Sequence, residues 1–421
     1  MIKNLQIKNY KSIEKLSLEL GRVTVLIGEN GAGKSNILEA ITLVGAACSK
    51  KLDNEFLLSR GIRVGESKLM RSAFSSSPER ECAPIEVIVE SENSKAHFSL
   101  TNDNKPYSKW ECHTDYTEEG DAAPELSDVI NDLFFSRKLP KNKRKKIMES
   151  LNIVLSIIEE VKGIDDGLAK DEYIREHLSK RIKPGDALFE HFLENEDRMN
   201  EIGIPLSNFI TFAPENSQLR NQEISSTIEP LGIKGEGLLK LVFFISQFDE
   251  DFKLVKDNLR LLGWFSDLTV REESSGYGLE IKDLYCEDAG CALDQNAVNE
   301  GFMFLLFYFA LFAAPIGSTF FAIDNIDTSL NPKLCQKLIK QLVDIAKLKN
   351  KQVILTTHNP AILDGLNLDD EEQKLYAVSR SRGGQTKVSR IEKPKDIKGA
   401  PQLRLSEMFL RGLIGGLPKG F

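Results

Sequence analysis

The segment Gly28–Ser35, which reads GENGAGKS, constrains this chain more than any other feature of its sequence. It fits the P-loop pattern G-x-x-x-x-G-K-[ST], in which backbone N–H groups of a glycine-rich loop wrap around a chain of phosphates. A β-branched run, Arg22–Ile27, leads directly into the loop, and a helical pattern follows from Lys34 to about Ala47. A glycine-rich turn without a ligand would explain neither neighbour. The sequence therefore predicts a phosphate-binding strand–loop–helix unit.

Each part of this loop has a chemical role in binding ATP and Mg²⁺. Its glycines permit the backbone angles and the close approach that a phosphate needs, and the Lys34 ammonium would face the β- and γ-phosphates. The Ser35 hydroxyl would be a ligand of Mg²⁺. We expect the nucleotide contacts of the loop to come from Asn30, Gly31, Ala32, Gly33, Lys34, Ser35 and Asn36.

Two later apolar strands end in polar residues that suit the same site. The run FFAID ends in Asp324, which would orient Mg²⁺ together with Ser35. The run VILTT is followed by His358, whose ring suits a hydrogen bond to the γ-phosphate. The alternatives are an ordinary buried strand that ends in a turn acid and a purely structural histidine. The presence of the P-loop favours the functional interpretation of both residues.

The composition is that of a mildly acidic globular chain, with 421 residues, 41% hydrophobic residues and a net charge of −8. The first residues lack the apolar block of a signal peptide, and the longest apolar run, Phe302–Ile316, is too short to span a bilayer. We therefore expect a cytoplasmic protein with no membrane partner. The six cysteines lack the pairing of a metal site, so we expect structural thiols.

Strand and helix patterns alternate in the first and last parts of the chain but not in the middle. The middle is charged, mostly helix-patterned and poor in β runs. The strand–helix–strand patterns of 320–379 imply a mostly parallel sheet covered by helices. We predict an α/β fold in three parts: an N-terminal part with the P-loop at 1–102, a mainly helical insertion at 103–205 and a C-terminal part at 206–421.

A basic stretch, Arg137–Lys146, lies in the predicted insertion and carries seven Lys or Arg residues. Clustered cations attract nucleic-acid phosphates without sequence preference, so this stretch is a candidate nucleic-acid contact. The alternative is a solvated linker or helix end, which Pro140 in its middle favours.

The quoted motifs carry a family resemblance. NYKSI and VLIGENGAGKSNILEAI near the start, then FFAIDNIDTSLNP and ILTTHNP after a long insertion, resemble the RecF/SMC/Rad50-like ABC ATPases. The resemblance implies a two-lobed ABC ATPase head, with a mixed N-terminal β lobe and a mostly parallel sheet. It also implies that Lys11 and Ser12 lie near the nucleotide, that Asp324 is the Walker B acid and that His358 is the switch histidine.

Members of this family dimerise head to head, and a signature loop of one copy closes over the ATP of the other. The best match to that loop is the segment Asn299, Glu300 and Gly301, which opens the long apolar helix, with Asn299 where the family usually has Ser. The residue after the Walker B acid is normally a Glu that orients the attacking water, but here it is Asn325. An amide cannot act as a general base at neutral pH, so we expect slow hydrolysis.

A narrower resemblance concerns function. IDNIDTSLNPKLC, VILTTHNPAILDGLN and the tail LSEMFLRGLIGGLP are similar to the stand-alone ATPases of bacterial anti-phage systems, among them the Septu, retron-associated and PARIS ATPases. This resemblance implies a homo-oligomer that controls a separate effector, such as a nuclease or toxin. The alternative is a DNA-repair or chromosome-maintenance ATPase, whose head would look the same.

Overall fold

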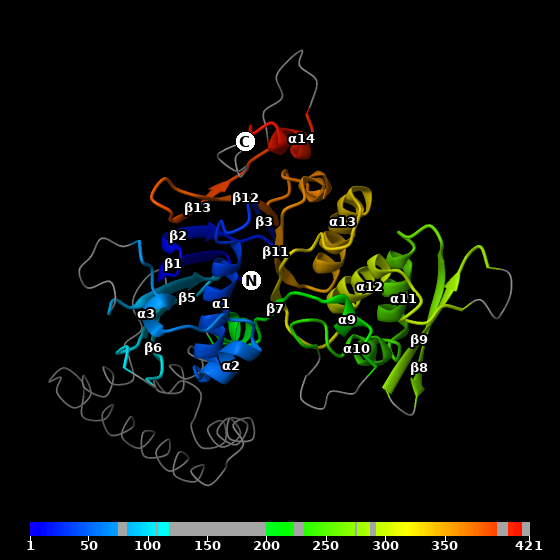
Figure 1. Cartoon of the computed structure of the whole chain (residues 1–421), viewed down its shortest axis with the longest axis horizontal. Helices are drawn as coiled ribbons and strands as arrows, with labels where there is room; N and C mark the ends of the chain where they lie inside the picture. Colours follow the sequence, from blue (N-terminus) through cyan, green and yellow to red (C-terminus); the bar gives the residue numbers. More distant parts are fainter. Residues whose placement is uncertain are drawn as a thin grey trace, which may run out of the picture. The chain divides into compact units, whose positions relative to one another are not determined.

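The computed structural model describes most of the chain, and Figure 1 shows its elements. The described residues are 1–74, 82–105, 108–117, 199–222, 231–273, 276–286, 292–393 and 403–414. They form two larger sheets, a β-hairpin and helices that pack on them. The predicted α/β class, with a mixed N-terminal β lobe and a mostly parallel sheet, is confirmed.

The larger sheet contains six strands within the described residues. These strands are β3 (Val23–Gly28), β7 (Thr211–Phe212), β10 (Phe320–Ile323), β11 (Gln352–Thr357), β12 (Gln373–Arg380) and β13 (Thr386–Arg390). Their order is β13-β12-β3-β11-β10-β7, and every pair from β12 to β7 is parallel, whereas β13 is antiparallel to β12. The carboxyl ends of β3, β10 and β11 therefore meet at one edge of the sheet, where ligands bind in sheets of this kind.

The N-terminal β lobe contains β1 (Asn4–Tyr10), β2 (Ile13–Glu19), β4 (Ile85–Glu90), β5 (Lys95–Thr101) and β6 (Glu111–Thr117) in the order β2-β1-β4-β5-β6. Strand β1 is antiparallel to both of its neighbours. Buried and partly buried side chains alternate along β4, as expected for a sheet with one covered face. All of β3 is buried, because the larger sheet is covered on both faces.

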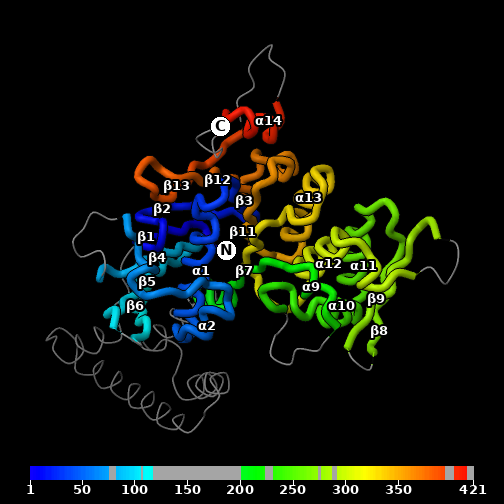
Figure 2. The backbone as a smooth tube through the Cα atoms, in the orientation of Figure 1, coloured from blue at the N-terminus to red at the C-terminus, as the bar shows by residue number. Residues whose placement is uncertain are grey.

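Two sets of helices cover the larger sheet. Helix α1 (Lys34–Cys48) contacts β3 and β7 of the larger sheet and also β1 and β4 of the N-terminal lobe, so it lies between the two sheets. Helix α12 (Glu300–Ala313) packs against α13 (Pro332–Leu348), and both belong to the hydrophobic core that includes Val23, Val25 and Ile27 of β3. Figure 2 shows α13 beside β11.

The remaining described elements are shorter. The helices are α2 (Asn54–Ser59), α3 (Ser67–Met70), η1 (Met199–Gly203), α8 (Ile204–Ser207), α9 (Asn216–Leu219), α10 (Leu238–Ile245), α11 (Asp249–Leu259), η2 (Pro360–Gly365) and α14 (Leu405–Leu410). The hairpin β8 (Phe265–Glu273) and β9 (Gly276–Asp283) packs on α10 and α11. No helix of the described residues is long and apolar enough to cross a membrane.

The cysteines differ in part from the expectation of free thiols. Cys48, Cys82, Cys112 and Cys335 are free. Cys286 is disulfide-bonded, so the expectation is wrong for this residue. No cluster of His, Cys, Asp or Glu suited to a metal ion occurs in the described parts of the chain.

Most of the predicted insertion at 103–205 and the whole basic stretch Arg137–Lys146 lie outside the described residues. The described part of that range includes strand β6, in a region where we expected mainly helix. By its contacts the chain divides into two compact units, and the smaller one holds 93–95 and 116–202. Everything described below belongs to the larger unit.

Candidate nucleotide-binding site

The P-loop connects the end of β3 to the start of α1, as the sequence predicts. Two glycines take left-handed angles that other residues rarely adopt, with φ of 75° at Gly31 and 110° at Gly33. Gly28 is required for a different reason, because a Cβ there would lie 2.0 Å from the backbone oxygen of Val378 in β12. The loop therefore needs its glycines for backbone angles and for close packing against β12.

Lys34 lies almost wholly inside the loop, with 5% of its surface exposed. Its ammonium donates hydrogen bonds to the backbone oxygens of Gly28 at 2.8 Å and Glu29 at 3.1 Å. Burial lowers the pKa of Lys34 to about 8, although the charges of Asp324, Asp327 and Glu29 oppose that shift. Among the described residues, no ion pair joins this buried ammonium to a carboxylate.

The two predicted Mg²⁺ ligands lie beside each other. The Ser35 hydroxyl donates to Asp324 Oδ2 at 3.1 Å, and the Thr356 hydroxyl of β11 donates to Asp324 Oδ1. A hydroxyl and one carboxylate, completed by phosphate and water oxygens, make up the all-oxygen set that Mg²⁺ prefers. The donor set therefore fits Mg²⁺ bound together with a nucleotide.

His358 lies at the same edge of the sheet, with its Nε2 3.2 Å from the Lys34 ammonium. Burial is the main reason that its pKa is lowered, and the Lys34 charge lowers it further. The imidazole is therefore neutral at pH 7 and carries one N–H donor. Asp327 accepts a hydrogen bond from the Thr357 hydroxyl at 2.5 Å, and its charge raises the pKa of both Lys34 and His358.

Asn325 is the residue directly after Asp324. It is exposed, its φ is 55°, and its backbone N–H donates to the Thr356 hydroxyl at 2.9 Å. Thr356 thus binds both Asp324 and Asn325 and fixes the turn that ends β10.

Lys11 and Ser12 lie in the turn between β1 and β2, where Lys11 has a left-handed φ of 45°. The Lys11 ammonium is paired with Glu39 of α1, which is buried. The Ser12 hydroxyl accepts a hydrogen bond from the Asn36 amide at 2.6 Å. The structure therefore brings both residues to the first turns of α1, next to the P-loop.

The signature-like segment lies elsewhere in the chain. Asn299 caps α12 by accepting a hydrogen bond from the Phe302 N–H at 2.9 Å. Glu300 accepts a hydrogen bond from the Ser329 hydroxyl at 2.6 Å, which ties this segment to the loop after Asp324. Among the described residues, no hydrogen bond or ion pair joins Asn299, Glu300 or Gly301 to the P-loop.

Two protein-family models match parts of this chain. A family model described as "AAA domain" matches residues 4–284, which is about two thirds of the chain. The chain belongs to this family of ABC-type, RecF/SMC-like ATPases. A second model, described as "AAA domain, putative AbiEii toxin, Type IV TA system", matches residues 303–364 of this ATPase.

Curated relatives of this ATPase match it over short segments. The OLD nuclease of Thermus scotoductus is 52% identical over 44 residues, which is 10% of this chain and 8% of the relative. An uncharacterized protein of Methanocaldococcus jannaschii is 35% identical over 114 residues, 25% of this chain and 49% of the relative. The RecF replication and repair protein of Bacillus thuringiensis is 43% identical over 60 residues, 14% of this chain and 16% of the relative.

The matches thus span less than half of the length of each of these relatives. Among solved structures, an Smc head bound to the C-winged helix domain of ScpA aligns with a TM-score of 0.52 and 16% identity. That alignment covers 93% of this chain and 98% of the other. At this identity the likeness concerns the fold, and it agrees with the ABC-type head.

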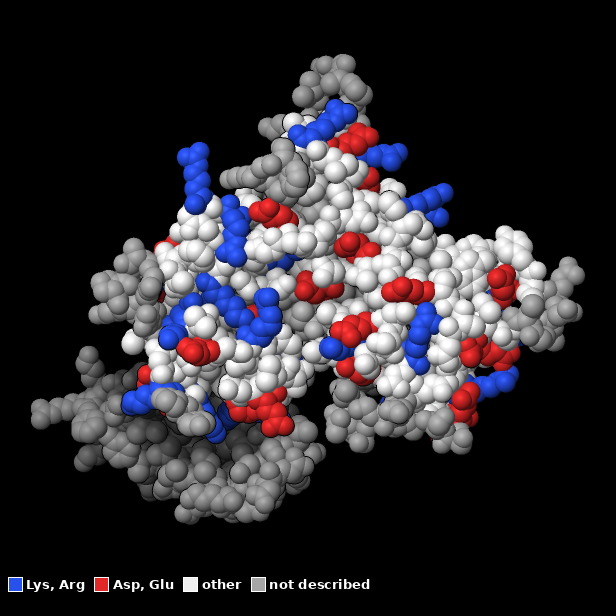
Figure 3. All heavy atoms as spheres, viewed as in Figure 1, with Lys and Arg blue, Asp and Glu red and all other residues white. Residues whose placement is uncertain are grey.

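Sequence reasoning missed several residues that contact the P-loop or α1. Thr386 of β13 and Arg380 of β12 donate hydrogen bonds to backbone oxygens of the loop. The Arg63 guanidinium donates to the Glu39 carboxylate at 2.6 Å and to the Asn36 side-chain oxygen at 3.0 Å. No local motif marks these residues, because their positions depend on how distant strands pair. The face that carries β1 and α1 has several Lys and Arg side chains close together (Figure 3).

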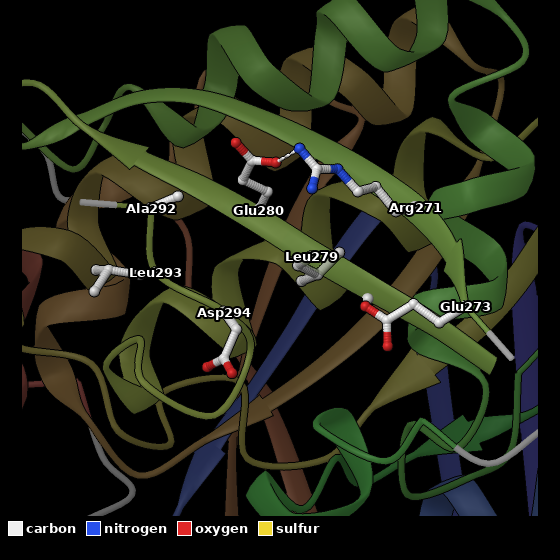
Figure 4. A pocket seen from close by; sticks show the side chains of 8 residues that line it. Arg271, Glu273, Leu279, Glu280, Ala292, Leu293 and Asp294 are labelled. Carbon is white, nitrogen blue, oxygen red and sulfur yellow. Dashed lines mark ion pairs between the residues drawn. The ribbon is translucent and has the colours of Figure 1, made fainter. Parts of the chain in front are cut away.

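A separate pocket of about 370 Å³ lies on the β8–β9 hairpin. Figure 4 shows Glu273, Glu280 and Asp294 around it, with Glu280 paired with Arg271. None of its lining residues belongs to the P-loop or to the ends of β10 and β11. It is therefore distinct from the nucleotide-binding site.

Proposed function

We propose that this protein binds MgATP at the edge of its larger sheet, hydrolyses it slowly, and uses it to control a separate effector protein. One observation carries the nucleotide part of this proposal. Lys34 and Ser35, at the start of α1, lie within hydrogen-bond distance of His358 and Asp324, which follow β11 and β10. The proposal rests on this combination of a buried cation, a hydroxyl–carboxylate pair suited to Mg²⁺ and a neutral imidazole.

In this proposal each residue has a separate task. The backbone N–H groups of the P-loop and the Lys34 ammonium bind the β- and γ-phosphates, which would give Lys34 the anionic partner that its buried position lacks. Ser35 and Asp324 hold Mg²⁺, which neutralises phosphate charge when it is bound. His358 donates one hydrogen bond to the γ-phosphate and thereby reports its presence to the loop after β11.

Slow hydrolysis follows in this proposal from Asn325. Its amide can orient a water molecule through a hydrogen bond but cannot take a proton from it at neutral pH. Asp327 follows Asn325 by two positions, and its oxygen already accepts a hydrogen bond from Thr357. Steady-state ATP hydrolysis of tens per second by the purified protein, absent in Lys34→Ala, would contradict the proposed slow hydrolysis.

A head-to-head dimer follows from the location of the signature-like segment. Asn299, Glu300 and Gly301 make their contacts with α12 and the loop of Ser329, so a P-loop would meet this segment only through a second copy. The molar mass of wild type and Lys34→Ala, measured by light scattering with and without MgATP, tests whether the protein dimerises. A monomer at micromolar concentration in saturating MgATP would contradict it.

Control of a nuclease or toxin in anti-phage defence is the wider function that we propose. The matched family description, which names the AbiEii toxin, and the short match to an OLD nuclease support a defence role. Affinity purification from the native host, with wild type compared with Lys34→Ala, is the experiment. A stoichiometric nuclease or toxin, lost or altered in the variant, supports the proposal.

The second candidate is a DNA-repair or chromosome-maintenance ATPase. The match to RecF over 60 residues and the cationic face around β1 and α1 favour it. It predicts that DNA stimulates ATP turnover and that the protein purifies without a partner. The predicted basic contact at Arg137–Lys146 stays a prediction, and charge reversal there should weaken nucleic-acid retention at low salt if it is correct.

A further inference from the structure

We infer that Thr386 and Arg380 are positioning residues of the P-loop, which hold its backbone in the orientation that accepts phosphate. This inference rests on the proposed ATP binding. Both residues come from the far end of the sequence, on β13 and β12, and neither belongs to a nucleotide motif. Their contacts fall on the backbone oxygens of Gly31 and Ala32, in the middle of the loop.

The Thr386 hydroxyl donates a hydrogen bond to the backbone oxygen of Ala32 at 2.9 Å. In a planar trans peptide the C=O and the following N–H point in opposite directions. Fixing the Ala32 oxygen toward β13 therefore turns the Gly33 N–H away from β13, toward the concave side of the loop. Arg380 fixes the preceding peptide, because its Nε donates to the Gly31 oxygen at 2.8 Å, and the N–H of that peptide, at Ala32, donates within the loop to the Glu29 oxygen at 3.3 Å.

The direction of the hydrogen bonds around Thr386 follows from counting protons. Its only hydroxyl proton goes to Ala32, so at the 2.7 Å contact with Ser12 the Ser12 hydroxyl must be the donor. Ser12 in turn accepts from the Asn36 amide at 2.6 Å. The result is one directed series from α1 through the β1–β2 turn to β13 and back to the loop, in which each bond polarises the next.

The packing leaves this position little freedom. Thr386 is 2% exposed, and its backbone N–H donates to the Ser12 oxygen at 2.8 Å, so β13 is bound to the β1–β2 turn directly. A Cβ on Gly33 would lie 2.0 Å from the Thr386 hydroxyl oxygen. The glycine in the loop and the threonine on β13 are thus matched in space, although 353 positions separate them in the sequence (386 − 33).

The test compares nucleotide affinity in matched threonine variants. Thr386→Val keeps the shape and removes the hydroxyl, Thr386→Ser keeps the hydroxyl, and Thr24→Val removes another buried hydroxyl from the same sheet, one that binds the Gly21 N–H. Affinity for a fluorescent ATP analogue is measured with Mg²⁺, well below the melting temperature of each variant. A melting curve of each variant separates loss of stability from loss of binding.

We expect Thr386→Val to bind about tenfold more weakly than wild type, as for loss of one buried hydrogen bond that orients a binding group. Thr386→Ser should remain within about twofold, and Thr24→Val should bind like wild type whatever its melting temperature. Unchanged affinity in Thr386→Val, or an equal loss in Thr24→Val, overturns the inference and leaves the proposed ATP binding intact. Wild-type protein that binds no ATP overturns both.

Arg380→Lys tests the same idea independently of whether Thr386→Val folds. It keeps the positive charge near the loop but cannot reproduce the Nε hydrogen bond to Gly31. A loss of about threefold in ATP affinity is expected. Affinity equal to wild type in Arg380→Lys would mean that only the charge matters there, which overturns the positioning role of Arg380.

Discussion

ATP binding should take up protons above pH 8, and the amount can be calculated from Lys34. Burial lowers its pKa to about 8 in the free protein, so at pH 8.5 about 0.75 of the side chains are neutral, and at pH 7 about 0.1. Bound phosphates would restore the charge, because nearby anions favour the charged form of an amine. Binding should therefore take up about 0.75 proton at pH 8.5 but only about 0.1 at pH 7.

The sign of the pH dependence follows from the same pKa. Affinity for ATP should be fully present below pH 8 and fall about tenfold per pH unit above it, until the pKa in the complex is reached. The contribution of Lys34 to the free energy of unfolding changes with pH in the opposite direction to the ATP affinity. The difference between the ordinary value of 10.5 and about 8 is a penalty of about 3 kcal/mol below pH 8, relieved as the pH rises from 8 to 10.5.

Isothermal titration calorimetry at pH 7 and 8.5, in buffers of different ionisation enthalpy, measures the proton uptake directly. The matched variant is Lys34→Arg, which stays charged at every pH used and should show little uptake at pH 8.5. Burial and the Lys34 charge lower the pKa of His358, so proton uptake by its ring on binding would be larger at pH 7 than at pH 8.5, which is the opposite trend. Equal uptake at both pH values, or full uptake at pH 8.5 in Lys34→Arg, would refute the reasoning.

Three further predictions concern the same edge of the sheet. Asn325→Glu should raise steady-state phosphate release at least about tenfold, because a carboxylate can act as the missing base; unchanged turnover would argue against it. Asp327→Asn should lower the pKa of His358 further, since this charge now raises it, and a nuclear magnetic resonance titration of the imidazole would detect the change. Gly28→Ala should destabilise the fold by about 3 kcal/mol in denaturant melts, because its Cβ would collide with Val378, whereas Gly65→Ala, with open space around it, should be near neutral.

The elements around the phosphate site could be predicted because local pattern determines them. The run before Gly28 is buried throughout, and the helix after Lys34 begins at the residue that the motif requires. Asp324 and His358 follow apolar runs of the length of a buried strand. Because parallel strands end at one edge of a sheet, these three strand ends could be brought together without knowledge of the strand order.

The supporting contacts could not be predicted, because they depend on strand order and register. Thr386 reaches the P-loop only since β12 pairs with β3 and β13 turns back beside the β1–β2 hairpin. The sequence does not indicate that Lys11 and Arg63 both bind Glu39, because Lys11 lies 28 positions before Glu39 and Arg63 lies 24 positions after it. Such pairings arise from tertiary packing, which hydrophobic periodicity does not predict.

The backbone at Asn325 offers a physical reason for Asn at this position that does not depend on hydrolysis. Its φ of 55° lies in the left-handed region, where Asn is enriched and Glu is not, because a short amide can bind the local backbone there. The turn after Asp324 therefore favours Asn whatever the rate of hydrolysis. The variant Asn325→Glu distinguishes the two explanations. Strain of about 1 kcal/mol should lower its stability, and the new carboxylate should raise its turnover. If stability falls and turnover does not rise, the turn alone explains Asn325, and the proposed slow hydrolysis would need another cause, such as the absence of a second copy of the chain.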